Sequence, residues 1–360
     1  MFSSGLLITR LAGPSIPVKI LILKPSSLGD VIQALPVLRL LKKHFPLSEI
    51  YWWIESGLAP LLEADPDLAG LVHFNRRRWA EPRNWARLFR TVRWARAQRF
   101  DLVIDLQCLA RSAVFGWLSN GQLSVGLDDS REGASGFYDL IVSRPSYNTH
   151  AVDWYLRVLN LLKVPVHWDF EWLPRRPEVE KAVRRKWPVR GNRWIVLQPG
   201  ARWLNKRWPV ESFAELVRTL SPSETHFRFA ILGSEEDVAL GASIAQAAPE
   251  RCLDLTGKVS LPEMLEWIRL CDVVISNDTG PMHAAAAMGK PLVALFGPTD
   301  PNRTGPYRQL QNVARTKLWC APCMSPRCHN PKKLECLREL PPSLVLERLR
   351  GHLGSLPTEA

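Results

Sequence analysis

A polar turn in the C-terminal half of the sequence carries residue types that can bind an anion. Val273–Ser276 is typical of a buried strand, and the chain then passes through Asp278, Thr279 and Gly280 into a predicted helix that contains His283. Backbone N–H groups at the start of a helix favour a negatively charged ligand, and a glycine lets that ligand approach closely. The turn therefore predicts an anion site, although a single helical histidine is more often only packed.

Two cations stand at the start of another predicted helix, in the stretch LQPGARWLNKRWPVESF. Lys206 and Arg207 precede the helix that begins near Val210, so side-chain charge and the helix N-terminus together favour a diphosphate. A solvated basic loop, with Trp208 packed as a hydrophobic staple, is the alternative interpretation. Farther on, LGSEEDV ends a strand, and Glu235 there either accepts hydrogen bonds from a ribose or caps the next helix.

The first predicted helix also begins with side chains that can do chemistry. In KPSSLGDVIQALPVL, Ser27 and Gly29 lie in the turn after a strand, and Asp30 opens the helix. An aspartate in this place commonly caps the helix by accepting backbone N–H groups. A general base is the other interpretation. The motif G-x-G-x-x-G is absent from the turn, which counts against a dehydrogenase.

These three sites lie at strand ends within a regular alternation of strands and helices. Such alternation predicts an α/β fold with parallel sheets, in which ligands bind beyond the carboxyl ends of the strands. The alternation is interrupted by a proline-rich stretch near 165–177. We therefore expect two Rossmann-like domains, 18–172 and 178–338, facing each other across a cleft.

Three stretches in this order, SSLGDVIQALPVL, PGARWLNKRWP and SNDTGPMHAAAAMGKPLVALFGPTDP, resemble glycosyltransferase family 9, the bacterial heptosyltransferases of lipopolysaccharide inner-core synthesis. RFDLVIDLQCLARSA and DDSREGASGFYDLIV are also similar to stretches of that family. The resemblance implies a GT-B fold, in which the first domain binds the acceptor and the second binds the nucleotide sugar. It also implies that a last helix, within 339–360, crosses back to the first domain.

The resemblance also implies roles for single residues. Asp30 corresponds to the general base that deprotonates the acceptor, and Lys206 to the lysine that neutralises the diphosphate leaving group. The implied reaction is a direct inverting displacement on ADP-heptose that requires no metal. The donor-binding candidates are Ser27, Gly29, Arg207, Glu235, Asp278, Thr279, Gly280 and His283. The acceptor-binding candidates are Arg111, Arg131 and His150.

The implied acceptor, a Kdo- or heptose-bearing lipid A core, is anionic, and the sequence has an excess of positive charge. It contains 47 basic and 35 acidic residues, for a net charge of +12. The stretch Asn75–Phe100 is rich in arginine, with Trp79, Trp85 and Trp94 interleaved. It is either a peripheral surface for the inner membrane or an ordinary solvated helix face. No recognition motif for nucleic acid is present, so we expect no nucleic-acid partner.

Four of the seven cysteines form the pattern C-x2-C-x4-C-x7-C in a proline-rich stretch. They are Cys320, Cys323, Cys328 and Cys336. Thiols at this density in a cytosolic protein are typical of a tetrahedral zinc site, and an iron–sulfur cluster, reduced thiols and reversibly oxidised thiols are the alternatives. We expect any such metal to be structural rather than catalytic.

The N-terminal 17 residues lack the features of a signal peptide, and no apolar run of about 18 residues occurs. The expected location is the cytoplasm, with peripheral association at the cytoplasmic face of the inner membrane. The predicted activity is heptose transfer, and the motifs leave open which heptose is added. The alternatives are a glycosyltransferase with another nucleotide-sugar donor, a nucleotide-sugar-binding protein without transfer activity, and a nucleotide-sugar epimerase.

Overall fold

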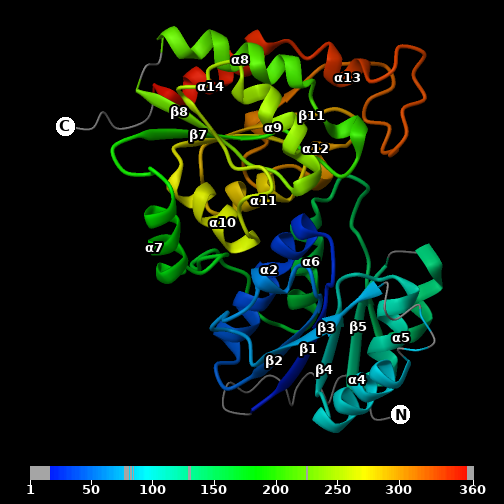
Figure 1. Cartoon of the computed structure of the whole chain (residues 1–360). Helices are drawn as coiled ribbons and strands as arrows, with labels where there is room; N and C mark the ends of the chain where they lie inside the picture. The colour runs from blue at the N-terminus through cyan, green and yellow to red at the C-terminus, as the bar shows by residue number, and fades with distance from the viewer. Residues whose placement is uncertain are drawn as a thin grey trace. The chain divides into compact units, whose positions relative to one another are not determined.

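The computed structural model describes residues 17–76, 81, 83, 85–128, 131–223 and 226–354. The chain divides into two units between Pro174 and Arg175, within the proline-rich stretch. Each unit contains a six-stranded parallel sheet with helices between its strands (Figure 1). The α/β fold and the two Rossmann-like units that the alternating pattern predicts are confirmed.

The first unit is built on strands that are apolar on both faces, as a parallel sheet covered by helices requires. The sheet order is β3-β2-β1-β4-β5-β6. The strands are β1 (Lys19–Leu23), β2 (Glu49–Glu55), β3 (Gly70–Phe74), β4 (Leu102–Asp105), β5 (Leu123–Leu127) and β6 (Leu140–Val142). The helices are α2 (Leu28–His44), α4 (Trp85–Gln98), α5 (Ala110–Ser119) and α6 (Ala151–Leu161), with the 3-10 segments η1 (Ala59–Leu61) and η3 (Arg131–Phe137).

Helices α4 and α5 share one face of the first sheet. Leu21 of β1 and Trp53 of β2 form one buried cluster with Ala95 of α4 and Phe115 of α5. The rings of Trp53 and Phe115 are stacked, with centroids 4.9 Å apart. The two helices also pack against each other (Figure 1). The sides of α4 and α5 that do not contact the sheet therefore lie on the same side of the first unit.

The second unit repeats the architecture with the sheet order β12-β11-β10-β7-β8-β9. The strands are β7 (Arg193–Gln198), β8 (Phe227–Ile231), β9 (Cys252–Asp254), β10 (Val273–Asn277), β11 (Leu292–Phe296) and β12 (Val313–Arg315). The helices are α7 (Pro177–Lys186), α8 (Val210–Ser223), α9 (Val238–Ala245), α10 (Leu261–Leu270), α11 (Gly280–Ala287), α12 (Pro301–Thr304), α13 (Glu335–Arg338) and α14 (Pro342–Leu353). The 3-10 segments are η4 (Leu204–Lys206), η5 (Glu235–Asp237) and η6 (Leu310–Asn312).

The last helix, α14, packs into the core of the second unit. Its residues Val345, Leu346 and Leu349 are buried in the cluster formed by α8 and the second sheet. This placement differs from the helix crossing back to the first domain that the resemblance implies for 339–360, because the apolar side of α14 is buried within its own unit. Among the described residues, no helix has the length and apolar character needed to span a bilayer.

Candidate functional site

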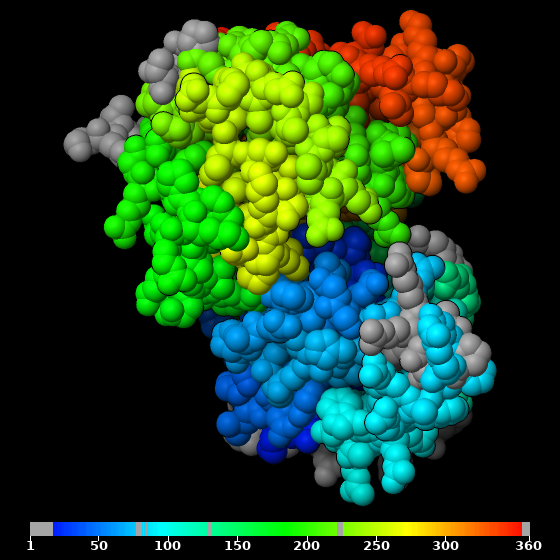
Figure 2. Space-filling view, in the orientation of Figure 1, coloured from blue at the N-terminus to red at the C-terminus, as the bar shows by residue number. Residues whose placement is uncertain are grey.

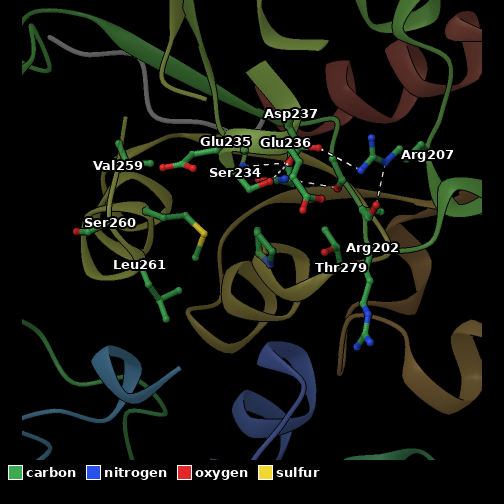
Figure 3. A pocket seen from close by; sticks show the side chains of 16 residues that line it. Arg202, Arg207, Ser234, Glu235, Glu236, Asp237, Val259, Ser260, Leu261 and Thr279 are labelled. Atoms are coloured by element: carbon green, nitrogen blue, oxygen red, sulfur yellow. Dashed lines mark hydrogen bonds and ion pairs between the residues drawn. The ribbon is translucent and has the colours of Figure 1, made fainter. Parts of the chain in front are cut away.

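Loops at the carboxyl ends of β7, β8, β9 and β10 line one pocket of the second unit. The pocket has a volume of about 650 Å³ and lies where parallel sheets bind ligands (Figure 3). It is lined by Gln198, Gly200, Ala201, Arg202, Arg207, Gly233, Ser234, Glu235, Glu236, Asp237, Val259, Ser260, Leu261, Met264, Thr279 and Pro281.

The lining is apolar at one end and cationic at the other. Figure 3 shows Val259 and Leu261 on one side of the pocket and Arg202 and Arg207 on the opposite side, with Glu235 in the upper part of the pocket. An apolar wall suits a flat ring, carboxylates suit hydroxyl groups, and arginines suit phosphate oxygens. The pocket is therefore suited to a nucleotide with its phosphates directed toward the arginines.

The side chain of Arg207 is held by two loops. Its Nε donates to the carbonyl oxygen of Ala201 at 2.8 Å, and a terminal nitrogen lies 3.3 Å from Oδ1 of the buried Asp237. The other carboxylate oxygen of Asp237 accepts hydrogen bonds from the N–H and the hydroxyl of Ser234, at 2.9 and 2.8 Å. Asp237 thus fixes the loop after β8 and orients Arg207 at the pocket.

The loops after β7 and β8 approach so closely that glycine is required. A Cβ atom at position 200 would lie 2.3 Å from Oδ2 of Asp237, and one at Gly233 would lie 2.8 Å from the Cβ of Asp237. Neither contact is sterically allowed without movement of the loops. Gly200 therefore permits the contact between Asp237 and the neighbouring strand end.

Lys206 and Asp278, which lie far apart in the sequence, form an ion pair. The Lys206 ammonium lies 2.6 Å from Oδ2 of Asp278, whose side chain is almost fully buried. The same oxygen accepts a hydrogen bond from the hydroxyl of Thr299 at 2.5 Å. The ammonium also lies 4.8 Å from the ring centre of Trp203. Asp278 thus holds a lysine at the strand edge that also forms the pocket.

Asn277, the last residue of β10, connects the same loops through its side chain. Its Oδ1 accepts a hydrogen bond from the N–H of Trp208 at 3.0 Å, and its Nδ2 donates to the carbonyl oxygen of Pro199 at 2.7 Å. The side chain is fully buried. The polar turn after β10 therefore positions the loop that carries Lys206 and Arg207, in addition to opening α11.

In the first unit, Asp30 takes part in the cap of α2. Its Oδ2 accepts hydrogen bonds from the N–H and the hydroxyl of Ser27, at 3.0 and 2.6 Å. His150 has a similar part in α6, where its Nδ1 accepts the N–H of Val152 at 3.2 Å. The N-cap of α2 is therefore Ser27 and not Asp30 as the capping interpretation has it; Asp30, at the third helical position, completes the capping box. Its action as a base stays a prediction.

Comparison with known proteins decides the family. The sequence pattern of glycosyltransferase family 9 (heptosyltransferase) matches residues 85–334, more than half of the chain. The chain belongs to glycosyltransferase family 9. It is 31% identical over 330 residues to lipopolysaccharide heptosyltransferase 1 of Pseudomonas aeruginosa, and this match covers 86% of the chain and 87% of the relative. The protein is therefore a glycosyltransferase.

Solved structures share the fold over nearly the whole chain. A glycosyltransferase family 9 protein from Veillonella parvula aligns with a TM-score of 0.80 at 22% identity, covering 95% of this chain and 99% of that one. The E. coli heptosyltransferase WaaC with ADP-2-deoxy-2-fluoro heptose aligns with a TM-score of 0.73 at 23% identity, covering 93% and 99%. These similarities confirm the GT-B fold.

The structure brings some of the predicted donor residues of this family 9 protein to the pocket. Arg207, Glu235 and Thr279 line it. Asp278 and Lys206 form their ion pair at the same strand edge without lining the pocket, and neither Gly280 nor the mostly buried His283 of α11 is in the lining. Ser27 and Gly29 belong to the first unit, at the start of α2.

Most of the pocket lining was not predicted from the sequence, since only three of its sixteen residues, Arg207, Glu235 and Thr279, were candidates. The apolar wall formed by Val259, Leu261 and Met264, the cation Arg202, and the Ser234–Asp237 pair were not predicted. A signal for the apolar wall was present, because Ser260 and Glu263 form a capping box at the start of α10. This motif marks a helix N-terminus after β9, where a ligand is expected.

The acceptor-binding candidates lie in the first unit or outside the described side chains. Arg111 lies in the first turn of α5, and its Nε is buried without a hydrogen-bond partner among the described residues. The side chain of Arg131 and residue Trp79 lie outside the part of the chain that the structure describes. These residues stay predictions.

The four clustered cysteines lie near one another in the second unit. Within the described residues, which include all four, no group of three or more His, Cys, Asp or Glu side chains is arranged to hold a metal ion. Burial, followed by the neighbouring thiols, raises the pKa of Cys336 to about 11. The Nδ2 of Asn330 lies 3.4 Å from the Cys320 sulfur. The structural metal site stays a prediction, as do reduced and reversibly oxidised thiols.

Proposed function

We propose that the protein transfers heptose from ADP-heptose to the Kdo/heptose inner core of lipopolysaccharide, with inversion at the anomeric carbon. The pocket of the second unit is the observation that carries the proposal, because its apolar wall suits adenine and its arginines suit a diphosphate. Two relatives support it by name: the one from P. aeruginosa is a lipopolysaccharide heptosyltransferase, and WaaC was solved with a fluorinated ADP-heptose.

In this proposal the first unit supplies the base and the second unit binds the donor. Asp30 takes the proton from the acceptor hydroxyl, whose oxygen bonds to the anomeric carbon of heptose as the bond to the diphosphate breaks. ADP leaves, and Lys206, oriented by Asp278, stabilises its negative charge together with Arg202 and Arg207. Because side chains neutralise the charge of the leaving ADP, we expect turnover to persist when EDTA removes divalent metal ions.

The proposed acceptor is carried by a lipid, so we place the protein at the cytoplasmic face of the inner membrane as a peripheral protein. The basic excess of the chain, +12, favours attraction to an anionic surface. This location follows from the acceptor and therefore depends on the proposed activity.

ADP release from ADP-heptose, measured with and without Kdo-bearing lipid A, tests the proposal. We expect release only with acceptor. Asp30→Ala should lower the rate by about 10²–10⁴-fold, the usual contribution of a general base. Asp139→Ala is the matched control, because Asp139 is a carboxylate of the first unit that likewise accepts the N–H and the hydroxyl of a serine, Ser124, and is not among the site candidates.

The outcomes separate the alternatives. ADP release without acceptor would indicate a hydrolase, and conversion of the donor to another ADP-sugar without ADP release would indicate an epimerase. Equal losses in Asp30→Ala and Asp139→Ala would reduce Asp30 to a structural role. Tight ADP-heptose binding without release would mean that the protein binds the donor but does not transfer it to this acceptor.

A further inference from the structure

Helices α4 and α5 expose large apolar side chains to solvent. On α4, Trp85 is 51% and Phe89 is 67% exposed, and on α5, Val114 is 38% and Trp117 is 62% exposed. Trp85 and Phe89 are four residues apart and Val114 and Trp117 are three apart, so each pair lies on one side of its helix. Grouped exposed aromatic residues of this size mark a contact surface rather than an ordinary solvated face.

The same helices carry only positive charge. The sequence of α4, WARLFRTVRWARAQ, contains no acidic residue, and neither does ARSAVFGWLS of α5. The arginines of α4 are exposed, whereas Ala95 on its opposite side is buried against the sheet. These arginines are Arg87, Arg90, Arg93 and Arg96. The exposed side of α4 is thus both aromatic and cationic.

The two helices present these residues together. Both cover the same face of the first sheet and pack against each other. Figure 2 shows the part of the chain that includes α4, in cyan, at the surface of the first unit. We call the exposed residues of the two helices the α4–α5 surface. They are Trp85, Arg87, Phe89, Arg90, Arg93, Arg96, Val114 and Trp117.

We propose that the α4–α5 surface docks the protein on an anionic lipid bilayer. Tryptophan and phenylalanine partition into the interfacial layer of a bilayer, and arginines attract anionic headgroups. Arg93 and Arg96 lie on the side of α4 that carries Trp85 and Phe89, whereas Arg87 lies on the opposite side. The helix is too short and too polar to span, which fits a helix lying in the plane of the interface. The inference rests on the proposed function, because a lipid-borne acceptor requires the enzyme to work at a membrane.

Flotation of the full-length protein with vesicles tests the docking. We expect binding to vesicles of phosphatidylcholine mixed with phosphatidylglycerol, weak binding to phosphatidylcholine alone, and weaker binding at high salt. Replacing Arg90, Arg93 and Arg96 by glutamine should reduce partitioning on the order of 100-fold, since each arginine near an anionic surface contributes about fivefold. The double variant Trp85→Ser and Phe89→Ser should remove the part of the vesicle binding that persists at high salt.

Matched control variants show whether vesicle binding depends on the α4–α5 surface or only on the net charge of the protein. Arg185, Arg190 and Arg218 are exposed arginines of the second unit, so replacing them by glutamine removes the same charge elsewhere. Trp319, 83% exposed in the second unit, is the control for the aromatic residues. Binding that ignores phosphatidylglycerol, or that falls equally in both arginine triples, would overturn the proposal.

ADP release with two forms of acceptor separates this inference from the proposed function. The α4 arginine triple should slow turnover on Kdo-bearing lipid A in vesicles and leave turnover on the deacylated, water-soluble acceptor unchanged. Equal losses on both forms would show that the surface binds the acceptor sugar, against docking. If the wild type releases ADP with neither acceptor, the proposed function fails, and the flotation result alone then decides the docking.

Discussion

The ion pair between Lys206 and Asp278 gives a first prediction at the scale of single residues. With the ammonium 2.6 Å from the buried carboxylate, Lys206 is a fixed cation at the donor edge. Lys206→Met should lower kcat/KM for ADP-heptose by about 10²–10³-fold, as for the loss of one preorganised group at a developing charge. Lys206→Arg should retain more activity, since the charge is kept.

The control for Lys206 is another lysine of the same unit. Lys290 donates to the carbonyl oxygen of Arg269 at 3.1 Å and does not line the pocket, so Lys290→Met should leave kcat/KM unchanged. Steady-state kinetics of the three variants with the wild type is the measurement. Full activity in Lys206→Met would remove the lysine from the mechanism.

Asp237 gives a second prediction, because it orients Arg207 from behind the pocket. Asp237→Asn keeps the shape of the side chain but removes the charge 3.3 Å from the guanidinium. We expect ADP to bind roughly tenfold more weakly, a loss of about 1.4 kcal/mol, because the ion pair no longer orients the guanidinium at the pocket. Calorimetric titration with ADP measures the change.

A second arginine–aspartate pair of the same unit serves as the control for Asp237. Arg193 lies 3.1 Å from Asp272, at the opposite ends of β7 and β10 from the pocket. Asp272→Asn should therefore leave ADP affinity unchanged. Equal weakening in both variants would point to general destabilisation of the second unit rather than to the orientation of Arg207.

At the scale of single residues, the sequence predicted which residues lie at the pocket better than it predicted which side chains pair with each other. Arg207 and Glu235 were placed correctly at a ligand site because each follows a strand end, where the chain geometry restricts what they can face. The pairing of Arg207 with Asp237 was not predicted, because it depends on two loops that meet only after the sheet has formed. The same is true of Lys206 with Asp278, which lie 72 positions apart in the chain (278 − 206).

At the scale of elements, the contact between the loops after β7 and β8 gives a third prediction. Gly200→Ala would place a methyl group 2.3 Å from a carboxylate that Ser234 and Arg207 hold in place. We expect the loops to separate and ADP affinity to fall by at least about tenfold, a loss of roughly 1.4 kcal/mol. Gly351→Ala, in open space near the end of α14, is the control and should stabilise the protein by about 0.5–1 kcal/mol.

Binding isotherms and thermal unfolding distinguish a local effect from a global one in these glycine variants. Weak ADP binding with a normal Tm in Gly200→Ala would confirm that the glycine serves the pocket. Normal ADP affinity in that variant would show that ADP binding does not depend on the close approach of the loops after β7 and β8.

The placement of α14 gives a fourth prediction, on pH. A ring nitrogen of His352 lies 3.1 Å from the carbonyl oxygen of Leu292 in β11, and burial lowers the pKa of the histidine. Because the folded pKa lies below the unfolded value of about 6.5, the unfolded chain binds the proton more readily. His352 therefore adds stability above that value and loses it as the pH falls toward the folded pKa.

Urea unfolding of wild type and His352→Gln, compared across this range, measures that contribution. The wild type should lose more stability than the variant between about pH 7 and 5. Parallel pH profiles would contradict the burial of His352 against the second sheet.

The elements themselves were largely predictable. Helix α8, which begins at Val210, and the helical pattern after Asp30 were predicted because apolar residues recur with the period of a helix. Short strands such as β6 and β9 were not, since three residues carry too little pattern to stand out. The packing of α14 into the second unit was not predicted, because its apolar stripe, Val345, Leu346 and Leu349, does not specify which core it enters.

At the scale of the whole molecule, ligand binding should affect one unit. All sixteen residues that line the pocket belong to the second unit, so we expect ADP alone to protect only segments of that unit from hydrogen exchange. The segments are 198–207, 233–237, 259–264 and 279–281. Segment 85–117 of the first unit, which carries α4 and α5, should exchange at the same rate with and without ADP.

The same experiment on Asp237→Asn shows whether the protection comes from the pocket. At an ADP concentration that saturates the wild type, the variant should show reduced protection in 233–237, because Asp237 orders that loop. At 100 times Kd, a ligand that binds only the native state stabilises it by about 2.7 kcal/mol, which is large enough to detect as slower exchange. Protection confined to the first unit would place the nucleotide there and overturn the assignment of the donor pocket, since two separate cores are expected to respond separately to a ligand held by one of them.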